Sequence, residues 1–432
     1  MPKSIICVKL SLDVGFPPAM WRLIMYIKRH IEDVIEKRAK TYPVVLVTGS
    51  RQTGKSTMLK NTVAKDIPKF TMDNRALLSS VLIDPQGFIK DNLPPIFIDE
   101  IQDAPELFHA IKMVCDDNSL KDGLYFITGS QKYVLMQGVS ESLAGRISIL
   151  DLHAFSLREI SGDKFATPFL PTTDYYSSRK PQFNLDSKKL WQYIQHGLLP
   201  KPAVREDVEW EPYYSDYLNT YLERDVRKLS QVGDLITFTN FMTALAARTG
   251  QIVNYAALAK DVGVSETTIK RWISILEATN IIYLLQPYFA NISKRVIKAP
   301  KVYFFDTGLV SYLCRWLTPE TLQNGAMSGA IFETFVVSEI LKSYCNAGKK
   351  PPLYYFRNDK GQEVDLLIYQ NGELYPIEIK KTASPNAKNV SVFNILADIY
   401  PNVKIKTGAL VCMCDSVLSL GDNAKAVPIN YI

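Results

Sequence analysis

The sequence of 432 residues contains few of the side chains that build soft metal sites or disulfide frameworks. It has four histidines and six cysteines, and no two cysteines form a CxxC pair. A metal site rich in histidine or cysteine is therefore not expected. Cys412 and Cys414, in GALVCMC, are interpreted as buried strand thiols, and reduced thiols favour a cytoplasmic location.

Long apolar runs are also missing. No run reaches the roughly 18 residues that suggest a membrane span, so we expect no membrane partner. Residues 1–24 hold only the short run SIICV, which is unconvincing as the apolar region of a signal peptide. Because a helical pattern opens at Met25, residues 1–24 are interpreted as a candidate extension, and either Met1 or Met25 is the true start.

The composition predicts a soluble, globular chain of several domains. Apolar residues make up 47% of the chain and charged residues 22%, whereas a disordered chain would hold far fewer apolar residues. A chain of this length exceeds one ordinary core, so we expect several domains. The net charge of +6 permits contact with nucleic acid but does not require it.

The segment PVVLVTGSRQTGKSTMLKNTV predicts a strand, a glycine loop and a helix. The loop matches GxxxxGK[ST] at Gly49, Gly54, Lys55 and Ser56. Glycines let backbone N–H groups surround phosphates, the lysine reaches the β- and γ-phosphates, and the serine hydroxyl is placed to ligate Mg²⁺. The predicted cofactors are therefore ATP and Mg²⁺. The loop residues expected at the nucleotide are Gly49, Ser50, Arg51, Gln52, Thr53, Gly54, Lys55, Ser56 and Thr57.

Two later strands end in polar residues that suit the same site. LPPIFIDEIQDAP places Asp99 and Glu100 at the end of an apolar strand. Asp99 is expected to hold Mg²⁺ through water, and Glu100 to polarise the water that attacks ATP. GLYFITGS ends in Ser130, which either senses the γ-phosphate or only caps a turn.

With these motifs the sequence resembles the AAA-type P-loop ATPases. SESLAGRISILDLHAFSLREI places Arg146 just before the next strand. In that family an arginine at this place reaches the nucleotide of a neighbouring subunit. The resemblance therefore implies that Arg146 is an arginine finger in a homo-oligomer, while a solvated surface arginine remains the alternative.

The middle of the chain predicts a linker with a helical lid (166–235) and then a winged helix-turn-helix (236–298). In NYAALAKDVGVSETTIKRW, Ser265 suits the N-cap of a second helix whose apolar face leaves Lys270 and Arg271 outside. IIYLL and KRVIK (294–298) are expected to pair as a wing, with Lys294 and Arg295 near its tip. These four basic residues predict contact with DNA phosphates, although winged helices also dock proteins.

The C-terminal segment GQEVDLLIYQNGELYPIEIKK predicts two neighbouring strands that carry charges. The strand period of two puts Glu363 and Asp365 on one face, and Glu378 and Lys380 on one face of the next strand. If the faces coincide, carboxylates converge over an apolar sheet, and a divalent cation would resolve their repulsion. A structural ion network is the alternative.

This arrangement is similar to the PD-(D/E)xK restriction-endonuclease-like nucleases, although "PD" itself is absent. The similarity implies that Asp365, Glu378 and Lys380 form the catalytic core, with Asp365 favoured over Glu363 as the ligand. It also implies that Glu333 on the preceding helix is an auxiliary metal ligand, with Glu339 as a competitor. The alternative is a nuclease-like domain that only binds.

Together these motifs resemble a widespread prokaryotic family of AAA-type ATPases that end in a domain of unknown function with a nuclease-like core. The expected fold is α/β and multidomain, with the ATPase at 25–165 and the nuclease-like domain at 299–432. The expected function is an ATPase whose nucleotide state controls DNA contact and Mg²⁺-dependent cleavage. Two alternatives are a non-cleaving, ATP-gated switch that binds a protein partner, and a protein that binds ATP but barely hydrolyses it.

Overall fold

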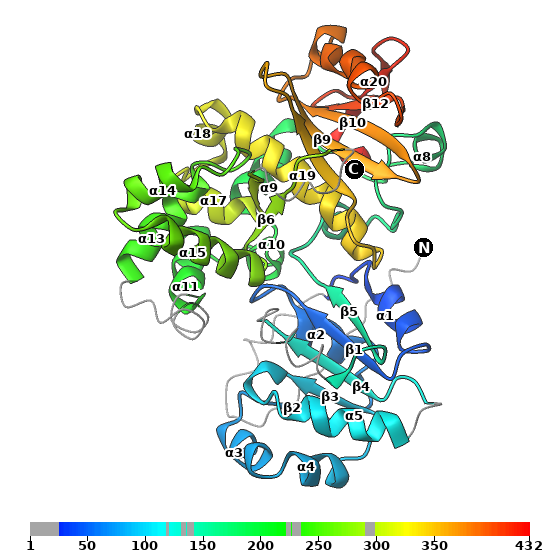
Figure 1. Cartoon of the computed structure of the whole chain (residues 1–432), viewed down its shortest axis with the longest axis vertical. Helices are drawn as coiled ribbons and strands as arrows, with labels where there is room; N and C mark the ends of the chain where they lie inside the picture. The colour runs from blue at the N-terminus through cyan, green and yellow to red at the C-terminus, as the bar shows by residue number, and fades with distance from the viewer. Residues whose placement is uncertain are drawn as a thin grey trace.

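The computed structural model describes residues 26–117, 121–130, 135, 142–221, 226, 235–289 and 299–432. The candidate extension 1–24, Lys294, Arg295 and the expected wing strand 294–298 lie outside these residues. Figure 1 shows an N-terminal lobe in blue and cyan, a helical region mainly in green, and a C-terminal sheet in orange. Among the described residues, no helix is both long and apolar enough to cross a membrane.

The N-terminal lobe is built on a sheet of five parallel strands. The strands are β1 (Val44–Thr48), β2 (Lys69–Thr71), β3 (Ile96–Asp99), β4 (Tyr125–Gly129) and β5 (Ile147–Asp151). The helices are α1 (Glu32–Arg38), α2 (Lys55–Asn61), α3 (Arg75–Ile83), α4 (Pro85–Asp91) and α5 (Leu107–Asp117), with a 3₁₀ turn, η2 (Ile101–Asp103). Apolar side chains of α1 and α2 cover one face of the sheet, and those of α3, α4 and α5 cover the other. The central strands are buried on both faces, which explains their nearly continuous apolar sequences.

The strand order brings the predicted nucleotide residues to one edge of this sheet. The order is β2-β3-β4-β1-β5, so β4 lies between the strand that precedes the glycine loop and the strand that ends in Asp99. Thr48 pairs with Gly129, and Thr71 pairs with Asp99. Because all five strands are parallel, their carboxyl ends meet at this edge.

A helical region follows the lobe. Its first helices are α7 (Leu157–Ile160), α8 (Thr173–Ser178), α9 (Ser187–His196), α10 (Pro200–Val204) and α11 (Trp210–Tyr221). It continues with α13 (Leu235–Ala246), α14 (Tyr255–Val262), α15 (Glu266–Ala278), α17 (Thr307–Leu313) and α18 (Pro319–Asn324). Tyr214, Tyr217 and Tyr221 of α11 are buried, so these rings pack in the core.

The two helices expected around Gly263 are present as α14 and α15. Gly263 ends α14 with a φ of 76°, and the Ser265 hydroxyl caps α15 by accepting a hydrogen bond from the Thr268 N–H at 3.1 Å. Strand β6 (Ile282–Leu285) then pairs in antiparallel fashion with β7 (Lys301–Phe304).

The pairing of β7 with β6 was not expected. The sequence placed residues 301–304 in the C-terminal domain, and the predicted boundary at 298/299 separates the two strands of this hairpin. All four residues of β7 are buried. A fully buried apolar strand carries no period that identifies its partner, so the sequence did not indicate which strand it joins.

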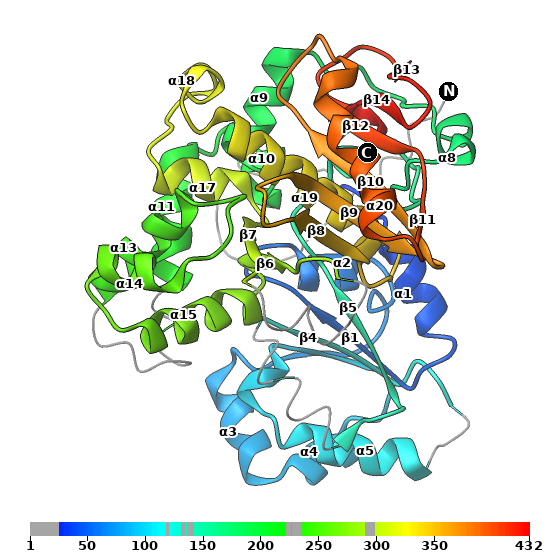
Figure 2. The same ribbon diagram turned by 45° about the horizontal axis from the view of Figure 1, so that its top comes forward.

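The C-terminal domain is a seven-stranded sheet behind a long helix, α19 (Ser328–Asn346). Its strands are β8 (Leu353–Arg357), β9 (Glu363–Gln370), β10 (Glu373–Ile379), β11 (Lys404–Ile405), β12 (Gly408–Cys412), β13 (Leu418–Ser419) and β14 (Ala424–Pro428). The order is β13-β14-β12-β10-β9-β8, and β11 pairs with β10. Apolar residues of α19 cover one face of the sheet, and η4 (Ala387–Ile395) with α20 (Leu396–Ile399) covers the other. A last 3₁₀ turn, η5 (Ile429–Tyr431), precedes the C-terminus, which Figure 2 marks beside the C-terminal sheet.

The turn after β5 joins the N-terminal lobe to α19. The buried Arg29 guanidinium forms an ion pair with Glu159 at 3.1 Å, and Glu159 also accepts the N–H of Ser156 at 2.8 Å. On the other side of the turn, the Leu157 N–H donates to Glu339 of α19 at 2.8 Å. Glu339 therefore serves this junction between the two regions.

We expect the Arg29–Glu159 pair to dominate the stability of this turn. Burial alone would raise the pKa of Glu159, but Arg29, His30 and backbone N–H groups outweigh burial and lower the pKa from 4.5 to about 2. Glu159→Gln leaves the Arg29 charge buried and unpaired, so it should reduce the free energy of unfolding by about 3–5 kcal/mol at pH 7, measured by urea denaturation of the full chain. Asp33→Asn, which breaks an exposed pair with Lys28, is the control and should cost less than about 1 kcal/mol.

The same variant gives a dependence on pH with a defined sign. Since the folded pKa of Glu159 is lowered, its contribution is complete above pH 4.5 and is lost as the pH falls toward 2. The stability of the wild type should therefore approach that of Glu159→Gln below pH 4.5. A difference that stays constant down to the acid limit would contradict this account.

Candidate functional sites

The glycine loop between β1 and α2 (residues 49–56, the P-loop) needs glycine at two positions. Gly49 has a φ of 149°, and a Cβ there would lie 2.0 Å from the carbonyl oxygen of Leu152. Gly54 has a φ of 88° and precedes the first residue of α2. The loop thus makes a tight turn at both ends, which is the backbone shape that lets N–H groups surround a phosphate.

Lys55 lies against the inside of the P-loop. Its side chain is buried, and Nζ donates to the carbonyl oxygens of Gly49 and Ser50, each at 2.9 Å. The Thr53 hydroxyl donates to the same Ser50 oxygen at 3.0 Å. The ammonium is therefore held beside the loop centre, where a phosphate would bind.

Asp99 accepts hydrogen bonds from hydroxyl groups of two neighbouring segments. The Ser56 hydroxyl donates to Asp99 Oδ1 at 2.7 Å, and the Thr128 hydroxyl of β4 donates to the same oxygen. Hydroxyl and carboxylate oxygens are the ligands that Mg²⁺ prefers, so the residues present fit this ion. The sequence predicted Ser56 and Asp99 each as residues that hold Mg²⁺, and the structure brings them into contact, whereas the position of Thr128 beside Asp99 depends on the strand order.

Glu100 stands next to Asp99 in a left-handed conformation with a φ of 56°. Its carboxylate accepts hydrogen bonds from the Gln102 side-chain amide and, at 3.4 Å, from the Ser130 hydroxyl. Ser130 thus contacts the expected catalytic carboxylate, and Gln102 is a site residue that the sequence did not reveal.

The remaining P-loop residues differ in their surroundings. Gln52 and Thr57 are exposed and Arg51 is half-buried. Gln52 has a φ of 60°, and its side-chain oxygen accepts a hydrogen bond from the Tyr213 hydroxyl at 2.5 Å. Tyr213 belongs to α11, so the helical region contacts the P-loop directly. No local sequence pattern indicated this contact.

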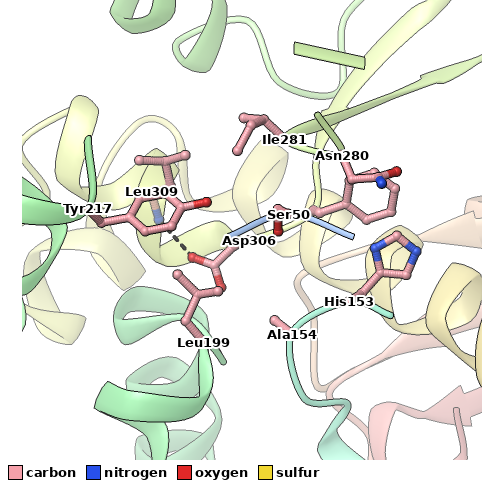
Figure 3. Close-up of a pocket in the computed structure, with 10 residues that line it drawn as sticks. Ser50, His153, Ala154, Leu199, Tyr217, Asn280, Ile281, Asp306 and Leu309 are labelled. Atoms are coloured by element: carbon pink, nitrogen blue, oxygen red, sulfur yellow. Dashed lines mark hydrogen bonds between the residues drawn. The ribbon is translucent and has the colours of Figure 1, made fainter. Parts of the chain in front are cut away.

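A small pocket lies beside the P-loop (Figure 3). The N-terminal lobe contributes Ser50 and His153, and the helical region contributes Asn280 and Asp306. The His153 ring stacks on Phe305 with a centroid distance of 4.2 Å. The side-chain nitrogen of Asn280 is buried and has no hydrogen-bond partner in the described part of the chain. The N-terminal lobe and the helical region thus meet at this pocket beside the P-loop.

Arg146 lies at the opposite edge of the N-terminal sheet. The residue after it, Ile147, pairs with Val44 at the start of β1, whereas the P-loop follows the end of β1. Five strand residues span roughly 13–16 Å, so Arg146 does not reach its own P-loop. Its guanidinium pairs with Asp116 at 2.5 Å, and its side chain is 36% exposed.

In the C-terminal domain, the faces of β9 and β10 coincide as the sequence required. The register pairs Leu366 with Ile377, and its continuation by one residue sets Asp365 opposite Glu378. Lys380 Nζ lies 2.7 Å from Glu378 Oε1 and 3.5 Å from Asp365 Oδ2. The three residues of the predicted catalytic core therefore lie together.

Glu333 of α19 and the strand β7 complete an acidic cluster. We define this cluster as the carboxylates Glu333, Glu363, Asp365 and Glu378 with the ammonium groups of Lys301 and Lys380. Glu333 accepts a hydrogen bond from the Tyr303 hydroxyl at 2.6 Å. Glu339 lies elsewhere, at the junction with the N-terminal lobe, where it pairs with Lys342. The sequence did not single out Lys301 or Tyr303, because their strand was assigned no partner.

Burial raises the pKa of two carboxyl groups in the acidic cluster. For Glu378, burial and then the charge of Asp365 raise the pKa, against the opposing effect of Lys380. For Glu333, burial and Asp365 raise the pKa, against Lys301 and Tyr303. Glu378 Oε2 is buried without a hydrogen-bond partner among the described residues. An unpaired carboxylate oxygen beside a second carboxylate suits a divalent cation.

The carboxylates are not yet gathered around one point. Within the residues that the structure describes, no three His, Cys, Asp or Glu side chains stand together as metal ligands. Lys380 contacts both Asp365 and Glu378, and Lys301 contacts both Glu333 and Glu363. A metal ion at Asp365 and Glu378 would therefore take the place of the Lys380 ammonium.

Lys270 and Arg271 are exposed on α15, as the helical pattern predicted. Lys270 Nζ lies 5.5 Å from the centre of the Tyr255 ring, which belongs to α14. Both charges are therefore available on the outer side of the second helix of the pair.

Three family models match successive parts of the chain. Residues 41–161 match a model described as an AAA domain. Residues 187–320 and 328–432 match models described as domains of unknown function, DUF8612 and DUF4143. The fold and the P-loop define the N-terminal lobe as a P-loop ATPase domain. Within that class, it is an AAA-type domain.

Two relatives are similar in sequence over most of this chain. The chain is 28% identical over 421 residues to the uncharacterized protein Rv2008c of Mycobacterium tuberculosis, and equally to the uncharacterized protein Mb2031c of Mycobacterium bovis. These alignments cover 97% of this chain and 88% of each relative.

Solved structures are more distant. The Walker-type ATPase PABY2304 of Pyrococcus abyssi is 14% identical, with a TM-score of 0.41 over 66% of this chain and 94% of that chain. A RuvB variant of Thermotoga maritima is 15% identical, with a TM-score of 0.27 over 59% of this chain and 86% of that chain. Scores this low do not establish a common fold.

Proposed function

We propose that this protein is an ATP-hydrolysing AAA-type ATPase whose nucleotide state controls DNA contact by a winged helix and Mg²⁺-dependent cleavage by the C-terminal domain. One observation carries the ATPase proposal: Ser56 and Thr128 both donate to Asp99 at the carboxyl edge of the sheet, with Glu100 beside them. This geometry supports a complete set of groups for phosphoryl transfer to water.

Each residue of this set has a defined task. The P-loop N–H groups and Lys55 would bind the phosphates, and Ser56 and Asp99 would hold Mg²⁺. When bound, the ion neutralises charge on the β- and γ-phosphates. Glu100 would accept the proton of the attacking water, and Ser130 and Gln102 keep its carboxylate in place.

Glu100→Gln should abolish ATP turnover and retain ATP binding. The amide keeps the size and the hydrogen bonds of the side chain but does not accept the water proton, and loss of a general base costs about 10²–10⁴-fold in rate. Phosphate release measures turnover, and binding of a fluorescent ATP analogue measures affinity. Glu106→Gln, an exposed substitution on the same segment, is the control. Wild-type turnover in Glu100→Gln would remove Glu100 from the chemistry.

Arg146 is proposed as a contribution to the site of a second copy. It lies too far from its own P-loop to act there, and it is half-exposed at the edge of the sheet. Oligomer formation would require the pair with Asp116 to open, which costs little for an exposed pair.

The cleavage proposal rests on Asp365 and Glu378, which lie opposite each other on adjacent strands beside Lys380. This matches the arrangement that the similarity to PD-(D/E)xK nucleases implies. Asp365 and Glu378 would hold Mg²⁺, with Glu333 as an auxiliary ligand. The ion would activate water and stabilise charge on the phosphate, and Lys380 would orient the nucleophile.

The wild type should cleave at least one member of a panel of labelled DNA and RNA substrates in Mg²⁺ or Mn²⁺. Asp365→Ala combined with Glu378→Ala should lose the cleavage, because the metal ligands are gone, and should retain ATP turnover. Electrophoresis with and without ATP reads the products. If no substrate is cut while ATP turnover is normal, the cleavage proposal fails.

The DNA proposal rests on α14, α15 and the β6–β7 hairpin, which have the order of a winged helix-turn-helix. Lys270 and Arg271 would contact phosphates. Lys270→Ala with Arg271→Ala should weaken binding to duplex DNA of any sequence, and should reduce the slope of log K against log salt by about 2. Lys349→Ala with Lys350→Ala removes two exposed lysines that follow α19, outside the winged helix, and is the control. Unchanged affinity would exclude this helix as the contact surface.

One observation favours a second candidate, a non-cleaving ATP-gated switch that binds a protein partner. The two lysines of the acidic cluster already contact all four carboxylates without a metal. A cluster whose carboxylates all have a lysine partner can serve as a structural ion network. Intact ATP turnover without cleavage, in the experiment above, would favour this switch.

A further inference from the structure

Lys301 reaches the acidic cluster from outside the C-terminal sheet. It is the first residue of β7, it is 2% exposed, and its partner strand β6 belongs to the helical region. Its Nζ lies 3.4 Å from Glu333 Oε1 and forms an ion pair with Glu363. Tyr303, two residues later, donates to the same oxygen of Glu333. Strand β7 thus holds Glu333 from one side.

The net negative charge of the acidic cluster equals the charge that one divalent cation would neutralise. Four carboxylates face two ammonium groups, which gives a net charge of −2 when all are ionised. Arg357 also approaches Glu363, at 3.4 Å, but its side chain is 50% exposed and solvent screens its charge. Within the acidic cluster, Glu378 Oε2 is a buried carboxylate oxygen without a hydrogen-bond partner among the described residues, and Lys301 does not contact it. The need for further positive charge therefore lies at Asp365 and Glu378.

We propose that Lys301 is the resident cation of the acidic cluster. It occupies the place of a second metal ion between Glu333 and Glu363, so that the cluster binds a single divalent cation at Asp365 and Glu378. Buried carboxylates require a nearby positive charge. An ammonium fixed to the chain supplies that charge permanently and does not dissociate as a metal ion does. Lys301 is a positioning residue, and this proposal rests on the proposed Mg²⁺ site.

The test is a titration of the full chain with Mn²⁺. Calorimetry measures the heat of binding, and the electron paramagnetic resonance signal measures the concentration of free Mn²⁺. All variants carry Asp99→Asn and are titrated without nucleotide, which removes the other candidate metal site. The reference chain should bind one Mn²⁺. Lys301→Met keeps the length of the side chain and makes the cluster −3, so it should bind Mn²⁺ at least about tenfold more tightly or take up a second ion.

Two matched variants separate charge from packing. Lys404→Met removes an exposed lysine of the same sheet that pairs with Glu373 at 3.2 Å, and should leave the Mn²⁺ isotherm unchanged. Glu363→Gln makes the cluster −1 and should weaken binding. Lys301→Met combined with Glu363→Gln restores −2, and should return the affinity toward the reference value. Circular dichroism verifies that each variant is folded, and Glu363→Gln alone still tests the proposal if Lys301→Met unfolds.

The outcomes distinguish this proposal from the cleavage proposal. Two Mn²⁺ ions in the reference chain, or identical isotherms for the reference chain and Lys301→Met, would overturn the role of Lys301. Binding of Mn²⁺ by Lys301→Met but not by the reference chain would overturn the single-cation site at Asp365 and Glu378, and with it the proposed nuclease, although it would still show that the Lys301 charge opposes metal binding. Absence of Mn²⁺ binding in both would overturn both proposals.

Discussion

The buried guanidinium of Arg29 fixes the place of the P-loop relative to the rest of the molecule. It donates to the carbonyl oxygen of Thr53 in the P-loop at 3.0 Å and to that of His153 after β5 at 2.8 Å, and it pairs with Glu159. A buried charge tolerates the loss of such partners poorly, because each lost contact leaves it unsolvated. The P-loop, the turn after β5 and α7 therefore hold one arrangement.

From this turn the constraint continues into the C-terminal domain. The Leu157 N–H donates to Glu339, and the Lys342 ammonium donates to the carbonyl oxygen of Phe155 at 3.0 Å. Glu339 and Lys342 both belong to α19, and Glu333 of the acidic cluster lies earlier on the same helix. A helix rises about 1.5 Å per residue, so one rigid element places Glu333 roughly 9 Å from the junction. The two candidate sites thus share a single support.

Whether the sequence could predict a contact depended on how far apart the two residues lie along the chain. Gly49, Lys55 and Ser56 lie within eight residues of one another, so a local pattern identifies them. The strand period predicted that Asp365 shares a face with Glu363 and that Glu378 shares a face with Lys380, but only the register of the two strands sets Asp365 opposite Glu378. Arg29 and Glu159 lie 130 residues apart, and no period links them. Lys301 was missed for the same reason, because a charge at the start of a buried strand has meaning only once its neighbours are known. The resemblance to known families supplied domain types but no partners for these side chains.

The strand β7 and the two residues after it form a continuous segment that runs from the acidic cluster to the pocket beside the P-loop. Lys301 and Tyr303 hold Glu333 in the acidic cluster, Phe305 stacks on His153, and Asp306 lines the pocket beside Ser50 of the P-loop. In an extended strand, alternate residues share a face, and six residues span roughly 17 Å. Asp306 is fixed in turn by Tyr214 and by the Leu198 N–H. Asp306 and Lys301 are therefore joined by one buried strand. If the nucleotide state controls the C-terminal domain as proposed, this strand is the segment through which it would act on the acidic cluster.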